Sequence, residues 1–170
     1  WTCTQTSGNV TGWSANAGPG VMTIDQTLAL SIWAADSVIY HITPQSNGCD
    51  GYIYDYTVTV NPIPELTTSP MYDSICSETA TNIQLTSTTS TTSFTWTAAL
   101  TAGDVTGFSN GTGDQITQTL TNNLSTFGSV TYTISPSTSS CTGLDTSYVV
   151  TVKPMPHLTN SPLGDSICNN

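Results

Sequence analysis

The sequence predicts an all-β protein built from tandem β-sandwich repeats. Segments of it recur at a fixed spacing, short runs alternate apolar with polar residues, and turn-forming residues separate those runs. A fixed period indicates an array of similar units, and strict alternation indicates strands with one buried face. Since about 90 residues can enclose a small core, we expect each repeat to be a domain.

The repeat is clearest at residues 58–76, VTVNPIPELTTSPMYDSIC, which return at residues 150–168 as VTVKPMPHLTNSPLGDSIC. These two copies are 92 residues apart. Near the start of the chain, Trp1 matches Trp96 at a separation of 95 residues. One loop of the two copies therefore differs in length by three residues.

Prolines mark the boundary between the copies. Pro62 and Pro64 end the last strand of the first copy, because proline cannot donate a ladder hydrogen bond and fixes φ. The chain is expected to continue as an extended, semi-rigid connector. The first copy opens at a Trp-containing strand, so we expect it to lack its first strands and the chain to be a window from a longer array. The predicted organisation is a repeat without its first strands over residues 1–64, a linker over 65–72, a complete repeat over 73–156, and a linker with the start of a third repeat over 157–170.

Alternating apolar residues predict the strands. In the first repeat these are residues 24–30, 38–43 and 52–60, with a short strand at Val10. In the second they are residues 74–77, 82–88, 92–97, a piece near Val105, 116–120, 128–135 and 146–152. Seven short strands with turns between them are typical of an immunoglobulin-like sandwich.

The predicted core of the second repeat follows from that fold. A Trp on the third strand and a Tyr on the sixth pack inside such sandwiches, and Trp96 and Tyr132 have those places. Each buried side chain is expected to contribute about 1.5–3 kcal/mol. The expected core residues are Ile83, Leu85, Phe94, Trp96, Tyr132 and Val150.

Composition excludes several classes of partner. The chain has 11 acidic residues and one basic residue, Lys153, giving a formal charge of -10, although only 7% of its residues are charged. Binding to nucleic acid or to an anionic bilayer requires clustered Lys and Arg, so neither partner is expected. No run of about 18 apolar residues predicts membrane insertion. Disorder, the other interpretation of a Thr- and Ser-rich acidic chain, conflicts with the regular alternation.

Catalytic motifs are absent from the sequence. His41 and His157 are its only histidines, and they align with Thr133 and Glu65 of the other copy. A surface histidine is the expected role at both places, and we expect neither enzymatic activity nor a cofactor. Asp73 and Asp165 recur at the junction between repeats and are weak candidates for a calcium site, which would need several more oxygen ligands.

The repeated motifs resemble those of a known family. A Trp-containing strand, VTG, ITQTLTN, VTYTISP, a lone Cys, VTVxPxP and SIC occur in that order. The pattern resembles the PKD-like, immunoglobulin-like repeats of giant cell-surface adhesins in gliding bacteria, of which the SprB-type mobile adhesins, exported by type IX secretion, are members. The resemblance implies a structural stalk segment at the cell surface, associated with the outer membrane. The implied partners are neighbouring repeats, the secretion and motility machinery, and surface polysaccharide.

Two other functions remain as alternatives. Trp13, Trp33 and Tyr52 would serve as a stacking platform in a module that binds carbohydrate or protein. However, Trp13 aligns with Phe108, and aromatic-for-aromatic replacement between copies favours packing within the domain. A fibre subunit that exchanges strands is the second alternative, since another chain would supply the missing strands.

The cysteines fit the extracellular location that the resemblance implies. In an immunoglobulin-like topology the first strand starts at the end of the sandwich that holds the loop between the last two strands. A disulfide between Cys76 and Cys141 is therefore expected, contributing about 4 kcal/mol. By the same rule Cys49 and Cys168 would pair with cysteines outside these 170 residues. Reduced core thiols are the alternative, and the pairing of Cys3 stays open.

Three Asp-Ser pairs resemble the O-glycosylation acceptor motif of secreted proteins from the same bacterial group. They occur as Asp-Ser-Val at Asp36 and as Asp-Ser-Ile at Asp73 and Asp165. The resemblance makes Ser37, Ser74 and Ser166 candidate glycan sites. A turn or cap role for each pair is the alternative.

Overall fold

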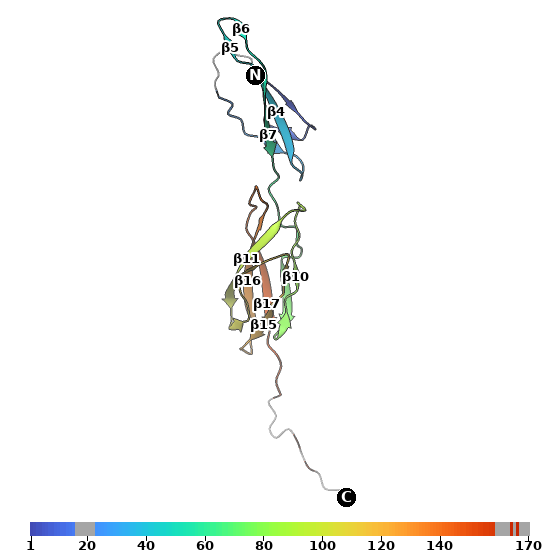
Figure 1. Ribbon diagram of the computed structural model, residues 1–170. Helices are drawn as coiled ribbons and strands as arrows, with labels where there is room; N and C mark the ends of the chain where they lie inside the picture. Colours follow the sequence, from blue (N-terminus) through green and yellow to red (C-terminus); the bar gives the residue numbers. More distant parts are fainter. Residues whose placement is uncertain (16–22, 159–163, 165, 167–170) are drawn as a thin grey trace. The chain divides into compact units, whose positions relative to one another are not determined.

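A computed structural model describes residues 1–15, 23–158, 164 and 166. All regular elements in these ranges are strands, which confirms the predicted all-β class (Figure 1). Among the described residues no helix has the length and apolar character needed to span a bilayer. Contacts divide the chain into two compact units, and the two repeats are described separately.

The first repeat centres on a three-stranded antiparallel sheet, in the order β1 (Thr2–Gln5), β4 (Asp36–Ile42), β7 (Tyr54–Val60). Two short strands, β2 (Val10–Thr11) and β3 (Ala29–Leu30), pair beside it. A hairpin joins β5 (Gln45–Ser46) to β6 (Cys49–Asp50). Its turn residues Asn47 and Gly48 both have positive φ, which suits the twist of a two-residue hairpin.

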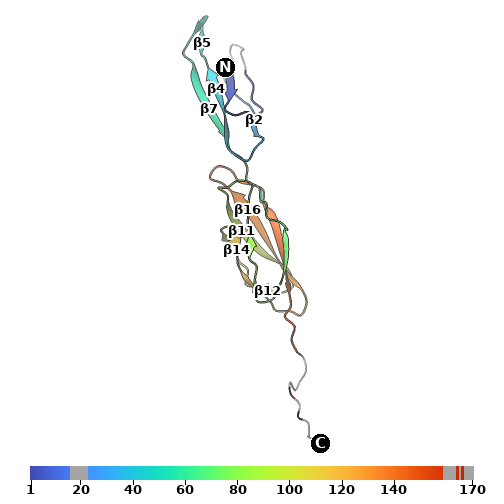
Figure 2. The same ribbon diagram turned by 90° about the vertical axis from the view of Figure 1, so that its right-hand side faces the viewer.

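The second repeat is a sandwich of short sheets. Its five-stranded sheet has the order β13 (Gly111–Thr112), β11 (Ser93–Ala102), β16 (Gly128–Ser137), β17 (Thr146–Lys153), β8 (Tyr72–Cys76). The facing layer contains β10 (Ile83–Gln84) with β14 (Gln115–Ile116), and β12 (Val105–Thr106), β15 (Thr119–Asn122) and β9 (Thr79–Ala80). Figure 2 shows β11 and β16 side by side. The immunoglobulin-like sandwich is thus confirmed.

The sequence repeat is also a repeat of strand register. Tyr40 lies opposite Tyr56 in the β4–β7 pair, and Tyr132 lies opposite Tyr148 in the β16–β17 pair. Each pair of partners is displaced by the same 92 residues that separate the copies. The periodicity therefore records one structural unit built twice.

The two repeats differ in how much of the core is covered. The predicted core residues of the second repeat are all buried, and Tyr132 and Val150 have no exposed surface. In the first repeat the described core consists of Val10, Val38 and Tyr40, with half-buried apolar side chains around it. The second repeat therefore holds most of the buried apolar surface that stabilises a sandwich.

One polar network recurs inside both sandwiches. The Tyr132 hydroxyl donates to Gln118 Oε1 at 2.9 Å, and the Gln118 amide donates to the Ser109 carbonyl at 2.8 Å. In the first repeat the Tyr40 hydroxyl donates to Gln26 at 2.8 Å, whose amide donates to the Ser14 carbonyl at 2.7 Å. The network satisfies a buried hydroxyl that would otherwise cost free energy.

A hydrogen bond to the Thr81 side chain interrupts one of the predicted strands. The strand expected over residues 116–120 is interrupted at Thr117 and Gln118. There the Gln118 N–H donates to Thr81 Oγ1 at 3.1 Å, and its carbonyl accepts from the Thr81 N–H. A side chain thus replaces one backbone partner of the ladder, and this substitution is not visible in the apolar pattern. The strand expected over residues 24–30 is reduced to Ala29–Leu30.

The segment predicted as a linker is partly hydrogen-bonded. The Thr67 N–H donates to the Thr86 carbonyl at 2.8 Å, and the Thr88 N–H donates to the Glu65 carbonyl at 3.1 Å. Leu66 and Ser87 form a bridge between these bonds. Residues 86–88, expected to extend the strand at Ile83, therefore pair with residues 65–67 instead.

A glycine is required at the same place in both copies. Gly107 has φ +93, and a Cβ there would lie 2.1 Å from the Thr119 carbonyl oxygen. Its counterpart Gly12 has φ +85 and the same conflict with Thr27 at 2.0 Å. Since L side chains rarely adopt this φ, a substitution meets both conformational strain and a steric clash.

We expect Gly107→Ala to lower the free energy of unfolding by more than the roughly 1–3 kcal/mol cost of positive φ alone. Gly8→Ala is the matched control, because Gly8 has φ +89 and open space around it. Urea unfolding of both variants measures the difference. Equal losses would show that the carbonyl clash contributes nothing.

Burial of Tyr132 predicts a pH effect. Burial raises the pKa of its hydroxyl to about 12, above the value of about 10 in an unfolded chain. As pH rises through this window the unfolded tyrosine loses its proton first, so stability is present below pH 10 and falls toward pH 12. Urea midpoints measured between pH 8 and 11 should fall more steeply for the wild type than for Tyr132→Phe. Parallel slopes would contradict this assignment.

Candidate functional site

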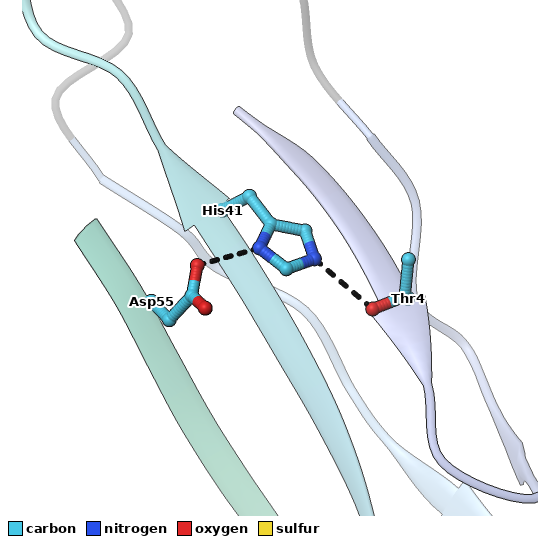
Figure 3. Close-up of polar contacts among 3 residues, drawn as sticks. All are labelled: Thr4, His41 and Asp55. Carbon is cyan, nitrogen blue, oxygen red and sulfur yellow. Dashed lines mark hydrogen bonds and ion pairs between the residues drawn. The ribbon is translucent and has the colours of Figure 1, made fainter. Parts of the chain in front are cut away.

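The residues most like a catalytic group lie on the open face of the first sheet. His41 on β4 lies between Thr4 on β1 and Asp55 on β7 (Figure 3). Its Nδ1 is 2.6 Å from Asp55 Oδ1, and its Nε2 is 3.1 Å from Thr4 Oγ1. The register places Asp55 directly opposite His41, so neighbouring strands alone bring these side chains together.

This arrangement has the order of a hydroxyl, a base and an orienting carboxylate. Its setting is different, because the side chain of His41 is 30% exposed and that of Asp55 60% exposed on a sheet surface. The hollow that the structure describes next to these strands is lined by Tyr40, Tyr56 and Val58, whose side chains alternate with His41 and Asp55 across the pleat. The contact is best explained as a cross-strand pair that stabilises the sheet by up to about 1 kcal/mol.

The other predicted histidine, His157, is exposed after the end of β17. No group of three or more His, Cys, Asp or Glu side chains suited to a metal occurs in the described part of the chain. Asp73 Oδ1 accepts from the Ser74 N–H at 2.6 Å, a local contact of the turn or cap kind that was the alternative to glycosylation of this Asp-Ser pair. Asp165 lies outside the described residues.

A buried carboxylate was not identified from the sequence. Asp36, 7% exposed, accepts hydrogen bonds at both carboxylate oxygens. Thr6 and Ser7 donate their hydroxyls at 2.5 Å each, and the Ser37 N–H donates at 2.8 Å. These bonds, with a further contribution from Asn9, lower the pKa of Asp36 well below its usual range. The second copy has Gly128 in this place, so the repeat pattern gave no signal.

The hydrogen bonds of Asp36 give one of the three Asp-Ser pairs, Asp36-Ser37, a structural role. Ser37, a candidate glycan site, is half-buried and has its hydroxyl 3.2 Å from Thr59 Oγ1. Asp36 serves as a polar anchor between β4 and the loop after β1. Ser74 is exposed on β8, and Ser166 is exposed. Of the three candidates, Ser74 thus combines exposure with a defined strand position.

The predicted disulfide between Cys76 and Cys141 is absent, because both thiols are free in the structure. Cys76 is the last residue of β8 and lies opposite Lys153, the last residue of β17. Cys141 precedes β17, which begins at Thr146. An eight-residue strand spans more than 20 Å, whereas disulfide-linked Cα atoms lie within about 7 Å. The first strand starts at the predicted end of the sandwich, but Cys76 lies at its other end.

Cys3 and Cys49 are also free. Cys3 packs against the core of the first repeat, and burial raises the pKa of its thiol. Cys49 is exposed in the β5–β6 hairpin. Cys168 lies outside the described residues.

The proposed aromatic platform is only partly a surface feature. Trp13 is half-buried and donates its indole N–H to the Val10 carbonyl at 3.0 Å, as expected for packing. Trp33 is 53% exposed and is therefore not a core residue. Tyr52, Tyr54 and Tyr56 are all more than 60% exposed and follow one another at every second residue into β7.

Comparison with known families identifies both repeats. The model of the PKD-like domain matches residues 1–64 and residues 73–156. No curated protein matches the chain in sequence.

The lowered pKa of Asp36 predicts acid sensitivity of the first repeat. Its contribution to stability is present above about pH 4, the range in which an unfolded aspartate ionises, and is lost as pH falls through the lower folded-state pKa. Unfolding followed at pH 7 and pH 2.5 should show a smaller acid loss for Asp36→Asn than for the wild type. The same loss in both proteins would show that other carboxylates cause it.

Proposed function

The chain belongs to the PKD-like domain family, and we propose that it forms part of the stalk of a large extracellular repeat adhesin. The stalk would lie at the cell surface, associated with the outer membrane, and gliding motility is the process in which it would act. Its partners would be neighbouring repeats and the secretion and motility machinery. In this proposal the role is mechanical and requires neither catalysis nor a cofactor.

The parallel β8–β17 pair is the observation that carries the proposal. Tyr72 lies opposite Val149, and Cys76 lies opposite Lys153. The chain enters this pair at the start of β8 and leaves it at the end of β17. A pull along the chain therefore loads the two strands in opposite directions along their length. All hydrogen bonds between them resist the pull together, which suits a domain that transmits tension.

The surface chemistry is consistent with exposure to proteases outside the cell. Lys153 is the only basic residue of the chain and is followed by Pro154. Trypsin-like enzymes cut after Lys or Arg and cut poorly before Pro, so the folded and the unfolded chain both offer them almost no site. Thr and Ser side chains, rather than charges, keep this surface soluble.

Alternate residues of β8 direct their backbone groups toward β17 or away from it, so one residue of each kind provides a test variant and its control. The Val149 N–H donates to the Met71 carbonyl at 3.2 Å, and the Ser77 N–H donates to the Lys153 carbonyl at 2.9 Å. Since alternate residues of an edge strand face its neighbour, Ile75 shares the phase of Met71 and Ser77. The N–H of Ser74 faces away from β17.

We expect Ile75→Pro to lower the force at which the second repeat unfolds, since it removes a ladder hydrogen bond with a stability contribution of about 1 kcal/mol. Ser74→Pro is the control and should retain most of that force. Single-molecule pulling of the chain between two handles measures both. Release of residues 72–153 should lengthen the chain by an amount consistent with about 3.3–3.6 Å per residue.

Two results would contradict the proposal. If the wild type unfolds at the same low force as Ile75→Pro, the β8–β17 pair does not resist tension. If antibody against the chain labels permeabilised cells and not intact cells, the extracellular location is wrong.

A further inference from the structure

The connector contacts the second repeat before β8 begins. Pro64 is fully buried, and a Cβ added to Gly143 would lie 2.0 Å from its carbonyl oxygen. The same Cβ would lie 2.9 Å from the ring of Pro136, which is also fully buried. Gly143 belongs to the loop between β16 and β17. This glycine therefore leaves room for Pro64 to pack against that loop.

Hydrogen bonds hold the residues that follow Pro64. Residues 65–67 pair with residues 86–88 through backbone bonds of 2.8 and 3.1 Å. The Thr67 hydroxyl also donates to the Thr86 hydroxyl at 2.9 Å. We call residues 64–67 the strap. Along the chain, the strap lies between the first repeat and the β8–β17 pair.

The strap is held less firmly than β8. Its pairing is an isolated bridge between Leu66 and Ser87, whereas β8 pairs with β17 along its whole length. Glu65 and Thr67 are exposed, so water competes for the hydrogen bonds of the strap. Segments of this kind open with a smaller free energy than the strands of a core. The strap can therefore open while the sandwich stays folded.

Tension on the chain reaches the strap before it reaches β8. A pull transmitted through residues 61–63 acts on the contacts of the strap, because they hold the chain ahead of Tyr72, where β8 begins. Opening the strap withdraws one fully buried side chain, Pro64, from the repeat. The buried side chains on β16 and β17, among them Tyr132 and Val150, belong to strands that stay paired.

We propose that the strap detaches under tension before the β8–β17 pair yields, and rebinds when the tension falls. While the strap is bound, residues 61–63 connect the end of β7 at Val60 to the second repeat. Once it is released, the connection extends over residues 61–71. A longer flexible segment is less stretched at the same extension, so release lowers the tension on β8. Both ends of the segment stay attached, so rebinding closes only a short loop.

Single-molecule pulling tests the order of these events. The wild type should show a short, reversible lengthening at low force, followed by unfolding of the second repeat at higher force. The first event lengthens the chain far less than unfolding of either repeat, because it frees residues 64–71 alone. This use of the strap rests on the proposed stalk function, since it requires a chain under tension.

Gly143→Ala should remove the first event and leave the force of the second unchanged, because the added methyl group takes the place of the Pro64 carbonyl. Thr142→Ala is the control, since Thr142 is an exposed neighbour in the same loop, and it should retain both events. Thr67→Pro removes the N–H that bonds to the Thr86 carbonyl and should also remove the first event. Ile75→Pro should instead lower the second force and retain the first event.

Two results would overturn the strap. One is a wild type that lengthens in a single event, and the other is a first event that persists in both Gly143→Ala and Thr67→Pro. A second event at low force in the wild type, after a normal first event, would contradict the stalk function and leave the strap intact. The two failures are therefore distinguishable.

Amide hydrogen exchange tests release of the strap without tension. The amides of Thr67 and Thr88 should exchange at least about tenfold faster than that of Ile75, which faces β17, because local opening costs less than global unfolding. Their exchange should also be insensitive to low concentrations of urea, since little surface is exposed on opening. Equal protection of the three amides would overturn the proposal, because the strap would then open only with the whole repeat.

Discussion

Both sandwiches depend on finding a partner for one buried tyrosine hydroxyl. The Tyr132 ring is fully buried, and its hydroxyl must bond inside the domain because an unsatisfied hydroxyl is costly there. Gln118 supplies the acceptor and uses its amide to hold the loop at Ser109. One side chain thereby connects the central strand, the facing layer and a loop. The same two hydrogen bonds join Tyr40, Gln26 and Ser14 in the first repeat.

Features that occur in both copies belong to the repeat unit, and features that occur in one copy are particular to that copy. Strand register, the strained glycines and the Tyr-Gln-Ser network occur in both copies, so they belong to the unit. Asp36 belongs to the first copy alone, where hydroxyls of the preceding loop surround its carboxylate. Asn122 has a related role in the second copy, since its amide donates to the carbonyls of Thr126 and Val152. Each copy thus fixes this end of the sheet with a different polar side chain.

Much of the fold was predictable, because alternation and register both have a period of two. The long strands at Tyr40, Tyr56, Tyr132 and Tyr148 and the core of the second repeat follow from that pattern. The interruption at Gln118 did not, since a side chain there replaces a backbone partner. The prediction of a Cys76–Cys141 disulfide was wrong because it used only the end of the sandwich at which the first strand starts. Cys76 is the last residue of that strand and therefore lies at the other end.

The candidate site was less predictable than the fold, because its residues come together only when the strands β1, β4 and β7 pair. His41 and Asp55 are direct partners across two strands, and Thr4 reaches them from a third. Ordinary sheet geometry explains their contact without a catalytic role.

The segment that matters most for function is β8, whose short sequence does two things. It closes the edge of β17, and by lying parallel to it it turns a pull on the chain into shear along both strands. A stalk made of such units resists tension only where every edge of this kind is occupied.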